Sequence, residues 1–157
     1  MILDDYIHRF LSEREPLMIH LAVADERMRP FSVRAFGKRV DRGTSTLRVY
    51  ILSSQASRFF SAARCGTGII TGLFTDGRTN ESYQCKGSLI ECGPCKDDEE
   101  DHADLQRYRE GSMRIFPKLY KQFPLSTSVC SFVSYRVEEI YIQTPGPNAG
   151  RLYGRGG

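Results

Sequence analysis

The stretch that decides the fold is PFSVRAFGKRVDRGTSTLRVYILSSQASRFFSAARCG, residues 30–66. It contains two segments in which apolar residues occupy every second position, the pattern of half-buried strands. These apolar residues are Phe31, Val33 and Ala35 in the first segment and Leu47, Val49 and Ile51 in the second. Asp41, Arg42 and Gly43 supply turn chemistry between them. The stretch therefore predicts a pair of antiparallel strands followed by a helix.

The helix that follows carries a candidate anion site at its start. Ala56, Phe59, Phe60 and Ala63 follow the spacing of one apolar helix face. Ser53 and Ser54 precede them where an N-cap is expected, and Arg58 comes one turn later. Free N–H groups, hydroxyls and a guanidinium at a helix start favour an anion such as a phosphate.

This ordered series resembles the FMN-binding split-barrel family, which includes pyridoxamine 5'-phosphate oxidase and related general stress proteins. Members carry an arginine on one strand, then a second strand, a Ser/Thr-rich corner and a basic residue in the next helix, and these hold FMN. The resemblance implies that FMN is the cofactor and that Arg34, Ser53, Ser54 and Arg58 bind it. Family residues at the start of a later strand also touch the flavin, and Ser82 is the nearest match.

The rest of the chain predicts a mainly β protein. Residues 1–15 hold an amphipathic helix, and further strand patterns follow it and the central stretch. We expect one domain over residues 1–157, a six-stranded antiparallel split barrel with flanking helices and an extended tail at 144–157. Gly111 and Pro117 predict two short helices after the acidic run KDDEEDHAD. In the resembled family a glycine recurs near Gly87.

Composition excludes several classes of function. The net charge of +3 is too small, and the basic residues too scattered, to indicate a nucleic-acid partner. No apolar run approaches the roughly 20 residues that a membrane span needs. The sequence also has no signal-peptide pattern, and we expect a cytoplasmic protein with no membrane partner.

The resemblance also implies partners. A six-stranded barrel leaves little internal room for a large ligand, so a flavin is expected to lie outside it. In the resembled family it lies in a cleft between two subunits. We therefore expect a homodimer with the flavin at the subunit interface, together with a small-molecule substrate or electron donor.

Cys92 and Cys95 bracket the motif CGPC, which looks like a thioredoxin redox centre. The acidic run that follows disfavours a thiolate, and the flanking chain does not read as the βαβ unit of that fold. A zinc site would need Cys85 or His102 as further ligands. The remaining interpretation is a tight turn after a strand with two incidental thiols.

The sequence of the tail differs from the substrate-binding motif of the named oxidases. Pyridoxamine phosphate oxidases bind substrate through an Arg-Leu-His-Asp-Arg run, whereas residues 151–155 read Arg-Leu-Tyr-Gly-Arg. We therefore expect a flavin-dependent oxidoreductase of unassigned substrate, with no catalytic residue assigned. The alternatives are a non-catalytic split barrel that binds flavin, haem or a deazaflavin, and a thiol-redox or zinc protein.

Overall fold

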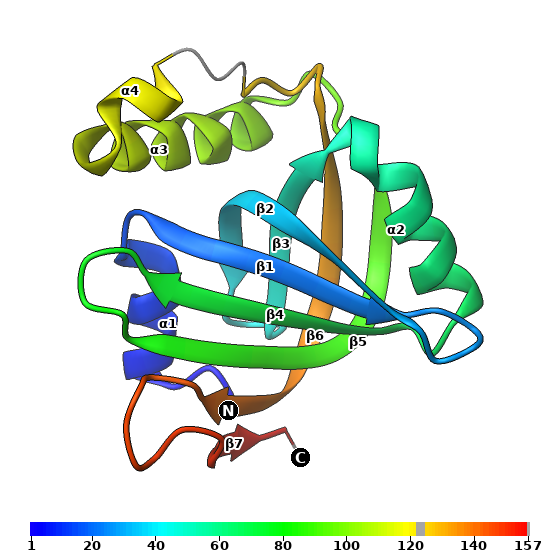
Figure 1. Ribbon diagram of the computed structural model, residues 1–157, viewed down its shortest axis with the longest axis vertical. Coiled ribbons are helices and arrows are strands. Elements are labelled where there is room, and N and C mark those ends of the chain that lie inside the picture. The colour runs from blue at the N-terminus through cyan, green and yellow to red at the C-terminus, as the bar shows by residue number, and fades with distance from the viewer. Residues whose placement is uncertain (122–124, 157) are drawn as a thin grey trace.

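The computed structural model describes residues 1–121 and 125–156, and its centre is a closed barrel of antiparallel strands. Figure 1 shows the strands curving around a common interior, with α2 along one side and α3 across one end. The elements are α1 (Asp5–Glu13), β1 (Leu17–Ala24), β2 (Pro30–Asp41), β3 (Thr46–Leu52), α2 (Ser53–Cys65), β4 (Ile69–Asp76), β5 (Ser82–Pro94), α3 (Glu99–Ile115), α4 (Pro117–Tyr120), β6 (Cys130–Ile142) and β7 (Leu152–Arg155).

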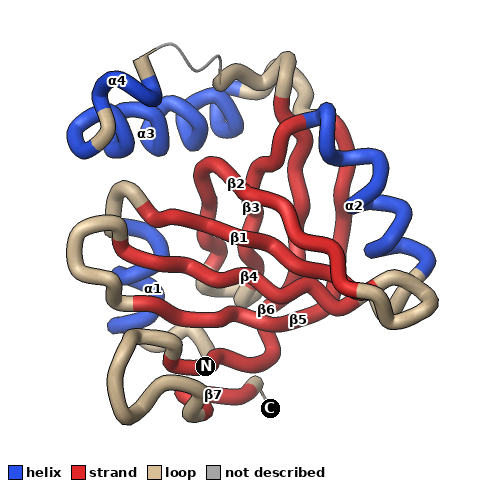
Figure 2. Tube along the Cα trace, in the orientation of Figure 1, coloured by secondary structure: helices blue, strands red, loops and turns tan. Residues whose placement is uncertain are grey.

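The sheet closes because its first and sixth strands pair. Its order is β3-β2-β1-β4-β5-β6-β7, and an additional β3–β6 pairing joins Val49 to Val133 and completes a six-stranded barrel. Closure removes the exposed edges of these six strands. Figure 2 shows the continuous ring of strands with the helices outside it. The predicted mainly β split barrel is confirmed.

The alternating segments at 31–35 and 47–51 lie in β2 and β3, and their apolar side chains fill part of the barrel interior. All the apolar residues of the β3 pattern are buried in the interior, as are Val33 and Ala35 of β2. Phe31 is only half-buried and packs against the edge of this core. A second apolar cluster lies outside the barrel under α3, and its buried members are Phe36, Tyr50, Leu105, Tyr108, Leu125, Cys130 and Phe132.

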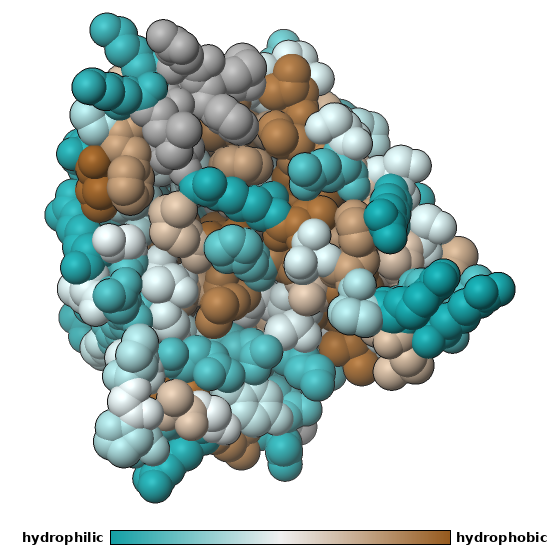
Figure 3. All heavy atoms as spheres, in the orientation of Figure 1, coloured by the Kyte–Doolittle hydropathy of each residue, from teal (hydrophilic) through white to brown (hydrophobic). Residues whose placement is uncertain are grey.

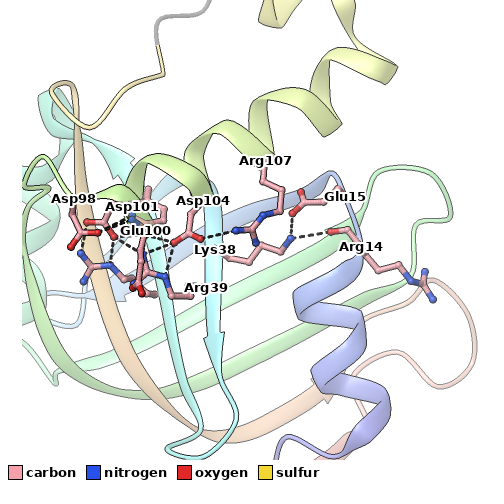
Figure 4. Close-up of polar contacts among 11 residues, drawn as sticks. Arg14, Glu15, Lys38, Arg39, Asp98, Glu100, Asp101, Asp104 and Arg107 are labelled. Atoms are coloured by element: carbon pink, nitrogen blue, oxygen red, sulfur yellow. Dashed lines mark hydrogen bonds and ion pairs between the residues drawn. The ribbon is translucent and has the colours of Figure 1, made fainter.

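An ionic network holds α3 on the outer surface of β2 and β3 (Figure 4). Arg48 donates to Asp101 at 2.9 and 2.7 Å, and Arg39 donates to Asp101 and Asp104, both at 2.8 Å. Both carboxylates are buried, with 2% and 3% of the Asp101 and Asp104 side chains exposed. The acidic run after the CGPC motif therefore supplies the partners of arginines that lie 53 to 65 residues earlier.

Tyr50 lies at the centre of this network. Its fully buried hydroxyl is 2.7 Å from Asp101 and 2.6 Å from Asp104. A hydroxyl has one proton, so it donates to one carboxylate at a time. Burial raises the pKa of Tyr50, and the hydrogen bonds to Asp104 and Asp101 raise it further, so this group stays protonated.

Gly111 lies within α3, where the sequence predicted a break between two helices. The prediction is right at Pro117, which begins α4, but wrong at Gly111. A Cβ on Gly111 would lie 2.9 Å from the Cβ of Glu15, so the glycine lets α3 approach the connection between α1 and β1. Beside it, the ammonium of the buried Lys38 pairs with Glu15 and donates to the Arg14 carbonyl, 3.1 Å away.

Part of the segment expected as an extended tail, 144–157, is a further strand. Residues 152–155 form β7, which pairs with the end of β6. The Tyr153 hydroxyl donates to Asp4, the N-cap of α1, at 2.7 Å. This contact ties the end of the chain to its first helix.

Candidate functional site

The candidate site lies where α2 faces the hairpin between β1 and β2. Its helix forms for the reason the sequence indicated, because Ala56, Phe59, Phe60 and Ala63 are all buried against the barrel. The opposite face of α2 is exposed and polar. Between that face and the hairpin is a groove of about 720 Å³, within the usual range of ligand sites, about 300–1,000 Å³.

Hydroxyl groups and one guanidinium line the helix wall of this groove. They belong to Ser54, Ser57, Arg58 and Ser61, which are exposed and lie on successive turns of one helix face. The hairpin wall contributes Asp25, Arg29 and Phe31, among others. The hairpin wall also carries the carboxylate of Glu26, so the basic and hydroxyl-rich part of the groove is its helix wall. That wall suits a phosphate or another oxyanion.

The start of α2 differs in detail from the predicted cap. Leu52 is the N-cap, and no side chain bonds to the first N–H groups from that position. Ser53 and Ser54 are instead the first two helical residues. The Ser53 N–H donates to the Val129 carbonyl at 2.9 Å, and its hydroxyl shares a 2.9 Å hydrogen bond with Ser131.

Two charged residues of the hairpin wall, Asp25 and Arg29, satisfy each other. Asp25 accepts from the N–H groups of Arg27 and Arg29 and pairs with the Arg29 guanidinium at 2.9 Å. The backbone hydrogen bond from Arg29, followed by the side-chain bond from Arg29, lowers the pKa of Asp25. Asp25 is therefore ionised at neutral pH and is already engaged with Arg29.

Arg58 is held differently. Its guanidinium lies over the Phe31 ring, 4.5 Å from the ring centroid. Over residues 1–121 and 125–156 no carboxylate pairs with Arg58. Its positive charge is therefore available to a ligand in the groove.

The other predicted site residues lie elsewhere. Arg34 is on β2, and its guanidinium donates to the Tyr108 hydroxyl on α3 at 3.3 Å. Ser82 is buried at the start of β5, where its hydroxyl lies 2.9 Å from both the Thr75 hydroxyl and the Asn80 carbonyl oxygen and donates to one of them at a time. The structure thus brings Ser54 and Arg58 together, with Ser53 beside them, and places Arg34 and Ser82 outside the groove.

The pairing of β4 with β5 and with β1 places Ser82 at the end of the barrel that lies away from the groove. Thr75, its partner across the sheet, is next to Asp76, which pairs with Leu17 at the start of β1. The groove is beside the opposite end of β1, where Ala24 pairs with Pro30. Ser82 and Arg58 are therefore separated by the length of β1.

Ser57 and Ser61 are groove residues that the sequence analysis missed. A signal for them existed, because Ser54, Ser57, Arg58 and Ser61 repeat the helical spacing that identified the apolar face. The polar face of the same helix could have been read in the same way.

Cys92, Gly93 and Pro94 of the CGPC motif end β5 and Cys95 follows directly, so the motif is not the tight turn that the sequence predicted. In extended backbone, residues three apart point to opposite faces of the sheet. Cys92 accordingly joins the barrel interior, whereas Cys95 packs against the outer cluster beneath α3. The two thiols are on opposite sides of the strand, and all five cysteines are free.

The electrostatics of these thiols disfavour redox chemistry. Burial raises the pKa of Cys92, and burial together with nearby Asp101 raises the pKa of Cys95 to about 12. Among the residues that the structure describes, no group of three or more His, Cys, Asp or Glu side chains is arranged to hold a metal.

We predict that iodoacetamide will modify the exposed Cys65 at neutral pH well before Cys92 or Cys95. Only the thiolate reacts, and a raised pKa leaves little of it. Residue-specific mass spectrometry over a range of pH measures each rate, with Cys65 as the internal control. Alkylation of Cys95 with a pKa below that of free cysteine, or insulin-disulfide reductase activity, would instead support the redox alternative.

Comparisons with known proteins support the fold. No protein-family model and no curated protein sequence matches the chain. Solved structures do match. HupZ of Group A Streptococcus has 15% identity and a TM-score of 0.53, over 94% of this chain and 98% of that one. General stress protein 26 of Bacillus anthracis has 12% identity and a TM-score of 0.53, over 90% and 94%.

A third match is named for the enzyme of the resembled family. A putative pyridoxamine 5'-phosphate oxidase of Listeria innocua has 16% identity and a TM-score of 0.50, over 90% of this chain and 98% of that one. At these identities the likeness concerns the fold. In its fold, the chain is a split barrel of the pyridoxamine 5'-phosphate oxidase and general stress protein type, as the sequence resemblance predicted.

Proposed function

We propose that the protein binds FMN, with the cofactor phosphate against the exposed face of α2. The observation that carries this proposal is the convergence of Ser54, Ser57 and the Arg58 guanidinium on one groove. Hydrogen bonds from an arginine to a phosphate are charge-assisted and directional. The nearby helix start, which has no side-chain cap, adds a favourable dipole for the same anion.

The proposed activity is that of a flavin-dependent oxidoreductase of unassigned substrate. Bound FMN would supply hydride or electron transfer, while the chain holds and orients the cofactor. The shared fold with a general stress protein and a putative pyridoxamine 5'-phosphate oxidase supports the cofactor class. The departure of residues 151–155 from the oxidase substrate motif is the reason for leaving the substrate open.

We further propose that the active form is a homodimer with the flavin at the subunit interface. The groove is open, so a ring that extends from it needs a second surface to shield it from water. The outer face of β1 and β4 offers one, with half-exposed Met18, Ala22 and Leu73 and exposed Ile69. Figure 3 looks onto this face and shows hydrophobic residues among hydrophilic ones. Symmetric dimers are the commonest assemblies of this kind.

No helix of the described chain is long and apolar enough to span a membrane. We propose a cytoplasmic location on the sequence evidence given above.

Arg58→Ala is expected to weaken FMN binding by about 1.5–3 kcal/mol, the range for a hydrogen bond to a charged group. Riboflavin, which has no phosphate, should bind the variant and the wild type equally. Titration monitored by flavin fluorescence measures both affinities. Arg64→Ala is the matched control, because Arg64 is on the same helix but donates to the Cys92 carbonyl at 3.0 Å. Equal FMN affinity in Arg58→Ala and wild type would show that the phosphate does not bind at Arg58.

The dimer proposal predicts that the FMN-bound protein will have twice the mass of the chain in multi-angle light scattering. Ile69→Glu should weaken this assembly, because it places a charge on the exposed apolar face of β4. Gln106→Glu is the control, because it adds the same charge at an exposed position on α3, outside this face. A stable monomer that retains FMN would contradict the proposal.

A further inference from the structure

We infer that Phe31 is a positioning residue for phosphate recognition, holding the Arg58 guanidinium ready for the anion without neutralising it. This inference rests on the proposed function, because it concerns how the same groove selects a phosphorylated ligand. It is carried by the contact between a ring on β2 and a guanidinium on α2, both of which line the groove.

The Phe31 ring is itself fixed. It is half-buried and packs against the barrel core, and its centroid is 6.4 Å from that of Phe59 on the buried face of α2. An exposed arginine on a helix otherwise samples many rotamers. A ring anchored on one side and exposed to the groove on the other gives Arg58 a preferred position.

The chemistry of this contact differs from that of an ion pair. A carboxylate would fix Arg58 equally well, but it would cancel the charge and compete with an incoming phosphate. An aromatic face attracts the guanidinium through its quadrupole and leaves the net charge unchanged. The N–H groups of a guanidinium lie in its plane, so a contact through its flat face leaves them able to donate.

Arg29, the other arginine of the groove, is fixed by a carboxylate instead of an aromatic ring. Arg29 lines the same groove, but its guanidinium is paired with Asp25 at 2.9 Å. Arg29 therefore stabilises the hairpin, whereas Arg58 remains available. The groove thus contains one arginine fixed by a carboxylate and one positioned by an aromatic ring.

The test is a comparison of FMN and riboflavin affinities in Phe31 variants of the full chain. Phe31→Leu keeps an apolar side chain but removes the ring. It should weaken FMN binding about 2- to 30-fold, the factor to which measured cation–π energies convert, and leave riboflavin unchanged. Phe31→Tyr retains the ring and should bind FMN as the wild type does.

Two further variants exclude a purely structural effect. In an Arg58→Ala background, Phe31→Leu should cause no further loss of FMN affinity, because the group that the ring positions is absent. Pentafluorophenylalanine at position 31 keeps an aromatic ring of similar size but reverses its quadrupole, and it should reproduce the loss seen with leucine. This substitution also serves if Phe31→Leu does not fold.

The outcomes separate this inference from the proposed function. Loss of FMN affinity in Arg58→Ala but not in Phe31→Leu would overturn the inference alone. Equal losses of FMN and riboflavin in Phe31→Leu would also overturn it, because they would indicate a contact with the flavin ring or a change in the fold. No preference for FMN over riboflavin in the wild type would overturn both.

Discussion

Asp101→Asn is expected to lower the free energy of unfolding by about 3 kcal/mol. The buried carboxylate accepts from Arg48 and from Arg39. The substitution removes the carboxylate that pairs with Arg48, whereas Arg39 keeps its contacts with Asp104 and Glu100. Breaking a buried ion pair from one side costs about 3–5 kcal/mol. We expect the low end of that range, because 20% of the Arg48 side chain and 32% of the Arg39 side chain are exposed and water can solvate them.

Urea denaturation of the variant and the wild type measures this difference. Asp97→Asn is the matched control, since it removes the same charge from the same acidic run at an exposed position. It should change the stability by no more than about 0.5 kcal/mol. Equal effects of the two substitutions would mean that α3 does not depend on the buried network.

The same network predicts how the stability difference between wild type and Asp101→Asn depends on pH. Burial alone would raise the pKa of Asp101, but the hydrogen bonds from Arg48 and Tyr50 outweigh it and the pKa is lowered. A carboxyl with a lowered folded-state pKa stabilises the fold above its unfolded value, about 3.9, and loses that contribution as the pH falls through the folded value. The stability difference between wild type and Asp101→Asn should therefore narrow only below about pH 4.

The barrel could be predicted from the sequence because its signals are local. The alternation in β2 and β3 and the apolar face of α2 depend on residues within a few positions of one another. The partners of Arg48 could not be predicted, because Asp101 is distant in the chain and one of several acidic residues in its run. Only the packing of α3 decides which of those carboxylates is buried.

Only the part of the site that depends on local spacing could be predicted from the sequence. Ser54 and Arg58 are one turn apart on a single helix, so local spacing places them together. The Arg34 side chain points toward α3 because the Tyr108 hydroxyl on that helix accepts a hydrogen bond from it. The distance between Ser82 and the groove depends on the register of β5 against β4. CGPC was misread because Gly-Pro is a strong turn signal. The ladder to β6, in which Pro94 pairs with Ser131, keeps this segment extended instead.

Gly87→Ala is expected to have an equally large effect, at least about 3 kcal/mol of destabilisation, because an added Cβ would overlap the backbone of β6. A Cβ on Gly87 would lie 1.7 Å from the carbonyl oxygen of Arg136 on β6. This neighbour is backbone, so no side-chain rotation can relieve the overlap. The register between β5 and β6 already shifts between Lys86 and Gly87, and added bulk there forces the two strands apart.

β6 also carries the pairing with β3 that closes the barrel, so a displaced β6 weakens closure as well as the local ladder. Thermal unfolding followed by circular dichroism measures the loss. Gly93→Ala is the matched control in the same strand, because the nearest atom to its added Cβ is a ring carbon of Phe132 at 3.7 Å, an ordinary contact. It should be neutral or slightly stabilising, since alanine restricts the unfolded chain. If both alanines gave the same melting temperature as the wild type, β5 and β6 would not approach as closely at Gly87 as described here.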